Sequence, residues 1–304
     1  MKTFKIVVSL FLLFTSVTFA RVSKSEKEIL LSLYQSTNGD NWTHKWDLSE
    51  PVEKWFGVTV IDGTVVELDL SANNLSGKLP QDLGLLTNLQ RLNLHMNSVE
   101  GLIPESIGEI ANLKELNLSF NSLTGDIPSS ICNVKSLENL ILFMNKISGS
   151  IPQSIGNLEN LKELTLFNNN ISGQLPTSIG TLKNLEVLHL SNNNIEGQLP
   201  KEISQLTELQ TLSIYDNQLA GNIPSSIGNL NKLTELSLGD NKLEGHVPTE
   251  LSNLKQLVTL ILSNNKLKGN IDEIISKIPT LVDIKFSSPR IKASFGIHNT
   301  LVSD

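Results

Sequence analysis

A spacing of 24 residues, kept without a slip over most of the chain, constrains the fold more than any other feature of the sequence. Asparagines recur with this period at Asn73, Asn97, Asn121, Asn145, Asn169, Asn193, Asn217, Asn241 and Asn265. Glycines follow the same period from Gly77 to Gly269, and prolines from Pro80 to Pro248. Three ladders in one register indicate tandem copies of a single unit, which is the signature of a solenoid.

The unit at residues 161–184, LKELTLFNNNISGQLPTSIGTLKN, predicts a short strand followed by a turn. Leu164 and Leu166 alternate with period two, as in a strand with one buried face. Asn169 is expected to pair its amide with backbone groups of neighbouring coils, because buried backbone groups need partners. One coil cannot bury its own leucines, so stacking must make the core continuous.

The pattern LxxLxLxxNxLxGxIPxxIGxLxx resembles the plant-type leucine-rich repeats of plant receptor ectodomains and polygalacturonase inhibitors, which also occur in secreted microbial proteins. The resemblance covers nine repeats at residues 65–280. It implies an α/β-type repeat solenoid, a right-handed superhelix. A parallel β-sheet is expected on its concave side and short irregular or 3-10 segments on its convex side.

Residues 21–64 are predicted to form an N-terminal cap with a helix. The pattern Ser25-x-x-Glu28 predicts a capping box that opens this helix, and the tryptophan-containing segments after it resemble the cap of the same family. Plant members carry a cysteine pair there, whereas this chain has Glu53 and Val60 in those places. The departure favours a microbial member of the family.

The two ends of the chain have separate predicted roles. Residues 1–20 combine early lysines, an apolar stretch shorter than a membrane span and small residues at Thr18 and Ala20, which predicts a removable signal peptide. The protein is therefore expected to be secreted, in the cell envelope or extracellular, without a membrane span. Residues 281–304 are expected to be a degenerate repeat that closes the core, because Pro289 stands where the next asparagine belongs.

Charge and the placement of reactive side chains argue against several functions. A net charge of −7 disfavours nucleic acid as a partner. The five histidines are scattered, and Cys132 replaces a repeat glycine as a small buried residue. Asp216 and Asp240 lie one coil apart, near the carboxyl separation of retaining glycosidases, but an open sheet does not enclose a sugar ring. We expect no enzyme activity, no cofactor and no metal.

Positions two, three, five, seven and eight of each repeat, counted from its opening leucine, are predicted to face outward on the concave side. Adjacent coils lie about 4.8 Å apart, so equal positions form columns across the sheet. In repeats two to five these columns hold aromatic and methionine side chains together, and such contiguous apolar groups mark contact sites. The predicted partner-binding residues are Met96, Phe120, Ile141, Phe143, Met144, Phe167 and Tyr215.

These features predict a binding protein that recognises a protein or peptide through its concave face. The alternative left open is a binder of glycan or surface polymer, or an inhibitor of an extracellular wall-degrading enzyme, as the resemblance to the plant inhibitors implies. Aliphatic and aromatic patches favour a protein partner, whereas spaced aromatics flanked by Asn and Asp favour a polysaccharide. The sequence contains both in part.

Overall fold

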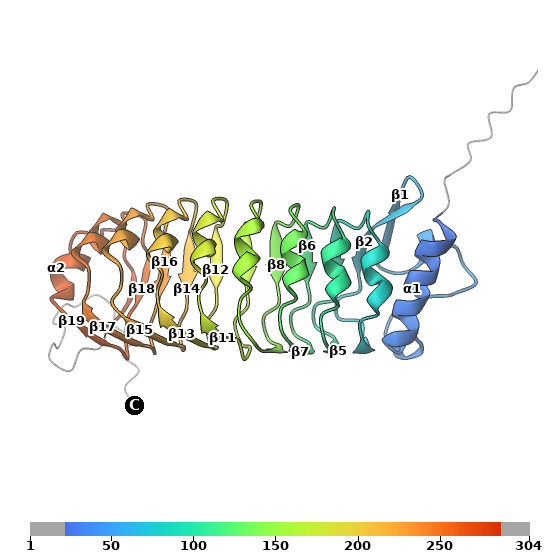
Figure 1. The fold of residues 1–304 in the computed structure, drawn as a ribbon, viewed down its shortest axis with the longest axis horizontal. Coiled ribbons are helices and arrows are strands. Elements are labelled where there is room, and N and C mark those ends of the chain that lie inside the picture. The colour runs from blue at the N-terminus through green and yellow to red at the C-terminus, as the bar shows by residue number, and fades with distance from the viewer. Residues whose placement is uncertain (1–21, 287–304) are drawn as a thin grey trace, which may run out of the picture.

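The computed structural model describes residues 22–286 as an elongated stack of coils (Figure 1). The helix α1 (Lys24–Ser36) covers one end of the stack and the short helix α2 (Ile271–Ile275) the other. The predicted signal peptide at residues 1–20 lies outside the described residues, as does Pro289 with most of the degenerate repeat. Each coil between the ends contributes one strand to a long sheet.

This main sheet is parallel from its second strand onward, as predicted. Its neighbouring strands among the described residues are, in order, β1 (Val58–Ile61), β2 (Thr64–Asp69), β4 (Arg91–Asn93), β6 (Glu115–Asn117), β8 (Asn139–Ile141), β10 (Glu163–Thr165), β12 (Val187–His189), β14 (Thr211–Ser213), β16 (Glu235–Ser237), β18 (Thr259–Ile261) and β20 (Asp283–Lys285). Strand β1 is antiparallel to β2. Leu164 pairs with Leu140 and Leu188, so equal repeat positions face each other across the sheet.

Two smaller parallel sheets, which the sequence did not predict, lie on a second side of the coils. The first contains β3 (Ser76–Lys78), β5 (Ser98–Gly101), β7 (Ser122–Gly125) and β9 (Lys146–Ile147). The second contains β11 (Ser172–Gln174), β13 (Asn194–Gln198), β15 (Gln218–Gly221), β17 (Lys242–His246) and β19 (Lys266–Lys268). Each of these strands except β9 and β19 includes the repeat glycine or ends on it, and that glycine has a positive φ.

Short 3-10 helices complete the first eight repeats, the helix α2 takes their place in the ninth, and the fold class predicted from the sequence is confirmed. In the repeats they span Gln81–Leu85, Glu105–Glu109, Ser129–Asn133, Gln153–Asn157, Thr177–Thr181, Lys201–Gln205, Ser225–Asn229 and Thr249–Asn253; two more, Gly39–Asn41 and Val52–Lys54, lie in the N-terminal cap. The repeat proline comes directly before each of the eight. Proline suits this place because its fixed φ starts a helical turn and its missing N–H is not needed there.

The core is a continuous column of aliphatic side chains. Leu161, Leu164 and Leu166 of the fifth repeat are fully buried, as are Ile179 and Leu182 from the far side of the same coil. The same positions are buried in the neighbouring repeats, so each coil packs on the next. This packing depends on the stack as a whole, because every coil takes part of its cover from its neighbours.

The predicted N-terminal helix is present, but the predicted capping box was wrong by two residues. Ser23 is the N-cap: its Oγ accepts a hydrogen bond from the Glu26 N–H at 3.2 Å and donates to the Glu26 carboxylate at 3.1 Å. The other Oε of Glu26 accepts from the Val65 N–H in β2. This contact with the sheet selects Ser23 and Glu26 over the equally spaced Ser25 and Glu28, because Glu26 is buried against the sheet.

Aromatic side chains seal the N-terminal end of the core. Tyr34, Trp42, Trp46 and Trp55 are buried and contact one another in series. Trp42 meets Trp46 edge to face with 5.0 Å between ring centroids, and Trp46 stacks on Trp55 at 4.6 Å. Their indole N–H groups donate to backbone carbonyl oxygens, including that of Thr37. Rigid rings with satisfied polar groups can close an apolar core without a covalent link.

Candidate binding surface

The repeated asparagines determine the path of the backbone at the end of each main-sheet strand. The Nδ2 of Asn169 donates to the carbonyl oxygens of Leu166 in its own coil and Leu142 in the preceding one, each at 3.0 Å. Its Oδ1 accepts from the Ile147 N–H at 3.0 Å. The side chain therefore bonds its own coil and the preceding coil. Equivalent bonds are made by Asn97, Asn121, Asn145, Asn193, Asn217, Asn241 and Asn265. Asn73, the first of the ladder, bonds instead to the backbone of His44 in the N-terminal cap.

The residue before each asparagine has a left-handed backbone. In all nine repeats φ at this eighth position lies between 50° and 57°. Asn and Asp tolerate this conformation better than other residues with a side chain, and repeats five to nine use them. Repeats two, three and four instead have Met96, Phe120 and Met144. Bulky apolar side chains are thus held in an unfavourable backbone conformation on three successive coils.

Five aromatic rings form an unbroken line over repeats two to six, which we call the aromatic run. Its members, in order, are His95, Phe120, Phe143, Phe167 and His189. The rings of Phe143 and Phe167 are stacked at 4.3 Å and 10°, and His189 stacks on the other face of Phe167 at 4.3 Å and 25°. Phe120 meets Phe143 edge to face at 5.4 Å. The ring faces in the centre of the run are therefore covered by other rings.

Most of the predicted partner-binding residues belong to this run or flank it. Met96, Phe120 and Met144 are 61%, 42% and 38% exposed, whereas Phe143 and Phe167 are half-buried by their neighbours. Ile141, also half-buried, precedes Phe143 by two residues and so lies on the same face of the sheet. Together they form an apolar surface with aromatic members and exposed edges on the outward face of repeats two to five.

Tyr215 is predicted with this group, but the structure places it apart. Ser191 occupies the same column between Phe167 and Tyr215, and no ring contact joins the tyrosine to the run among residues 22–286. The Tyr215 hydroxyl hydrogen bonds to the Asp240 carboxylate, and this bond, burial and the charges of Asp240 and Asp216 raise the tyrosine pKa to about 12. Tyr215 therefore belongs to a polar, acidic part of the surface.

Both histidines of the run were missed from the sequence as members of the surface. His95 hydrogen bonds through Nδ1 to the Ser119 hydroxyl at 2.8 Å, which fixes its ring beside Phe120. Burial lowers the pKa of His189, so its neutral form is favoured in the stack. His189, at position five of its repeat, points to the same face of the sheet as position seven of the preceding repeat. Considering these two columns together could have indicated His189 as a member of the surface.

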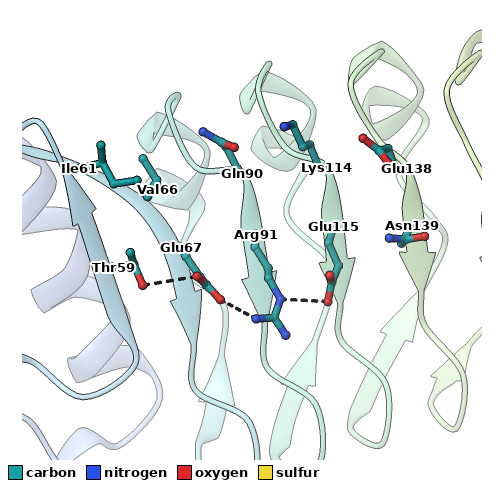
Figure 2. Close-up of a pocket in the computed structure, with 10 residues that line it drawn as sticks. All are labelled: Thr59, Ile61, Val66, Glu67, Gln90, Arg91, Lys114, Glu115, Glu138 and Asn139. Atoms are coloured by element: carbon teal, nitrogen blue, oxygen red, sulfur yellow. Dashed lines mark hydrogen bonds and ion pairs between the residues drawn. The ribbon is translucent and has the colours of Figure 1, made fainter.

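An N-terminal hollow of about 360 Å³ adjoins the aromatic run on the main sheet (Figure 2). Arg91 is one of the residues that line this hollow. Its guanidinium pairs with Glu67, with Glu115 at 3.2 Å and with Asp69 at 3.3 Å. Figure 2 shows the arginine held between carboxylates of the two neighbouring strands. Every nitrogen of this guanidinium has an acidic partner within the protein, so the ion-pairing capacity of Arg91 is already occupied.

The outward face of the main sheet is acidic. We define this open face by positions three, five, seven and eight of the nine repeats. It contains seven carboxylates, Glu67, Asp69, Glu115, Glu163, Asp216, Glu235 and Asp240, and one cationic side chain, Arg91. The first three carboxylates surround Arg91. The other four have no lysine, arginine or histidine within ion-pair distance in the described part of the chain.

Groups associated with metal binding or membrane insertion are not found within residues 22–286. No three His, Cys, Asp or Glu side chains in this range are arranged to hold a metal ion. Cys132 is buried in a 3-10 helix with its thiol unpaired, and burial raises its pKa, which disfavours the reactive thiolate. Neither helix of this range is long and apolar enough to cross a bilayer.

Comparison with protein families gives matches to three related models along almost the whole stack. Residues 64–86 match the model "Leucine Rich Repeat", residues 87–147 "Leucine rich repeat" and residues 145–291 "Leucine-rich repeat region". A comparison with curated protein sequences finds no match.

Solved structures with the same fold include plant receptors. The ectodomain of the Arabidopsis thaliana receptor kinase GASSHO1/SCHENGEN3, in complex with CASPARIAN STRIP INTEGRITY FACTOR 2, is 40% identical with a TM-score of 0.70. The match covers 72% of this chain and 26% of the receptor chain. The Arabidopsis HAESA ectodomain, in complex with an N-terminally extended IDA peptide hormone ligand, is 30% identical with a TM-score of 0.65; the match covers 87% of this chain and 53% of HAESA.

A plant ice-binding protein is similar over nearly its whole length. It is 27% identical with a TM-score of 0.66, and the match covers 82% of this chain and 89% of that protein. In contrast, this chain spans about a quarter of the GASSHO1/SCHENGEN3 chain and about half of the HAESA chain.

Proposed function

Because this chain is a leucine-rich repeat protein, we propose that it is a secreted binding protein that takes an extended peptide or protein segment across the open face of its main sheet. Solenoids of this kind are typically scaffolds for binding, with extended surfaces made by one side of all their coils. The similarity to receptor ectodomains that bind peptide hormones supports a peptide or protein as the partner. The resemblance to the family supports the concave side as the location of this face.

The aromatic run is the observation that carries this proposal. It puts Phe143 and Phe167 at the centre of the face, with more exposed apolar side chains beside them. Binding energy usually comes from a few central aromatic anchors surrounded by less important contacts. Rings already locked against each other lose little conformational entropy when a partner binds.

The geometry favours a protein partner over a glycan. Sugars bind proteins by placing their flat faces on exposed faces of aromatic rings. Here the central ring, Phe167, has Phe143 on one face and His189 on the other. Ring edges remain for contact, and these suit aliphatic side chains and backbone carbonyl oxygens of a peptide better than a pyranose.

Similarity to an ice-binding protein raises a second candidate, which the side chains of this chain do not favour. Ice presents a regular lattice and calls for a matching ladder of similar small groups. On the second sheet, Gln174 lies beside Glu196, and Ala220 lies between Gln198 and Lys242. Side chains of such different size and charge give no regular array. Thermal hysteresis and ice-shaping measurements on the purified chain test this candidate directly.

The export of the protein is part of the same proposal. A lysine-containing start, an apolar stretch and the small residues Thr18 and Ala20 support a signal peptide. Glu53 and Val60, in the places of the plant cysteine pair, support a microbial member of the family. Mass spectrometry of the protein from culture medium should give an N-terminus near Arg21; intact Met1 in the membrane fraction would contradict export.

The proposed function can be tested without knowing the natural partner. The purified chain is used to select from a display library of random dodecapeptides, and in parallel it is applied to an array of polysaccharides. We expect enriched peptides that compete with one another for one site, and no retention on the array. Retention on polysaccharides with no enriched peptide would contradict the proposal and favour the glycan alternative.

A further inference from the structure

The distribution of unpaired acidic groups over the open face shows what kind of peptide fits it. The aromatic run occupies repeats two to six, and at its N-terminal end Arg91 pairs with the three carboxylates of Glu67, Asp69 and Glu115. Beyond the run, Asp216 and Asp240 occupy position eight of repeats seven and eight with no cationic partner among the described residues. The Asp240 Oδ1 accepts a hydrogen bond from the neutral Asn264 amide at 2.7 Å, so its charge is not balanced. The face thus carries the aromatic run over repeats two to six and, beyond it, carboxylates without cationic partners in repeats seven and eight.

A third carboxylate joins the two halves. Glu163 precedes Thr165 by two residues in β10, and Thr165 pairs across the sheet with His189 of the run. Burial raises the pKa of Glu163, as expected for a carboxylate that lacks a nearby cation. By contrast, Glu138 at the edge of the sheet is paired with Lys162 at 2.7 Å. Glu163 has no such partner within ion-pair distance among the described residues.

We propose that the partner segment is an amphipathic basic peptide, bound along the solenoid axis with apolar side chains on the aromatic run and lysine or arginine side chains facing Glu163, Asp216 and Asp240. This inference rests on the proposed peptide-binding function and specifies the chemistry of the ligand. Complementary charge speeds association and selects against wrong partners, in this case acidic peptides.

Dimensions along the stack define the length of this segment. Phe143 lies in repeat four and Asp240 in repeat eight, so four intervals of about 4.8 Å separate them, or about 19 Å. An extended peptide covers about 3.3 Å per residue. A segment of about six residues, apolar at one end and basic at the other, therefore spans from the central phenylalanines to the aspartates.

The test uses the peptide library and a matched set of variants. Asp216→Asn with Asp240→Asn removes both charges while leaving the fold intact, because asparagine already occupies this position at Asn168, Asn192 and Asn264. Asp126→Asn, on the exposed segment after β7, is the control. We expect enriched peptides with an apolar residue and a lysine or arginine about six positions apart.

The charge variant should bind these peptides at least ~10-fold more weakly than the parent, and its affinity should depend less on salt between about 50 and about 500 mM NaCl. The control should bind like the parent. Enriched peptides without basic residues, or equal affinities for the charge variant and the parent, overturn the inference while leaving peptide binding intact. If no peptide is enriched at all, the proposed function itself fails.

Discussion

At the scale of single residues, positions nine and eight of each repeat affect stability in opposite directions. The asparagine at position nine satisfies buried backbone groups of two coils, as Asn169 does for Leu142, Leu166 and Ile147. The residue before it must adopt a left-handed backbone. Position nine is therefore occupied for stability in every repeat, whereas the apolar residues at position eight of repeats two to four suit a surface role.

Replacing Asn169 by leucine should lower the free energy of unfolding by roughly 1–3 kcal/mol, because the carbonyl and N–H groups that it satisfies stay buried without partners. The same change at the next residue, exposed Asn170, should have little effect. Urea denaturation of both variants measures the difference. Equal midpoints would contradict a stabilising asparagine ladder.

Replacing Met96 by asparagine should stabilise the protein by about 1 kcal/mol, since asparagine adopts the left-handed backbone more readily than methionine. The reverse change, Asn168→Met, should destabilise it. Denaturant unfolding followed by circular dichroism gives both values. If Met96→Asn is no more stable than the parent, the left-handed backbone of Met96 has no cost in free energy. The backbone conformation at position eight would then no longer support a functional role for this surface.

The histidine of the run gives a prediction for pH. Burial lowers the pKa of His189, so the unfolded chain takes up the proton before the folded chain does. The stability that this histidine contributes is present above its unfolded pKa of about 6.5 and is lost as the pH falls below that value. His189→Phe should therefore lose less thermal stability than the parent between about pH 7.5 and about pH 5.5. Exposed His246→Phe serves as control, and parallel pH profiles of parent and His189→Phe would exclude a role for this proton.

At the scale of elements, local sequence predicted the N-terminal helix and the strands of the main sheet, but not the residue at which the helix begins. Two Ser-x-x-Glu patterns overlap at the start of α1, and only the bond from the Val65 N–H to Glu26 selects between them. Such a long-range contact cannot be read from local spacing. The two small sheets were missed for a related reason: their strands are short and pair only when the coils are stacked, as Gly173 pairs with Ile195 of the next coil.

The attachment of α1 to the main sheet depends on Glu26. Replacing it by alanine should cost roughly 1–3 kcal/mol, because the Val65 N–H loses its acceptor in a buried place. Amide hydrogen exchange should then speed up in α1 before it does in the central repeats. Glu28→Ala, which removes an exposed side chain near Lys24, is the matched control. Equal exchange in both variants would argue against this link.

At the scale of the whole molecule, the 24-residue period predicted the stack and the outward columns, and the resemblance to plant-type leucine-rich repeats implied the parallel sheet. The binding surface was only partly predictable, because contacts in the run connect position seven of one coil with positions five and eight of its neighbours, as in the stack of Phe167 on His189. A prediction of the binding surface from each column separately includes Tyr215 and leaves out His189. The relative placement of columns is a property of the assembled sheet.

The most direct test of the central claim is the dissociation constant of one library-selected peptide for the double variant Phe143→Ala, Phe167→Ala, measured by calorimetry. Loss of central aromatic anchors should weaken binding at least ~10-fold while circular dichroism still shows the folded stack. Leu85→Ala with Leu102→Ala, which truncates two exposed apolar side chains outside the open face, should leave the affinity unchanged. If the phenylalanine variant is folded and binds as tightly as the parent, the aromatic run is not the binding surface.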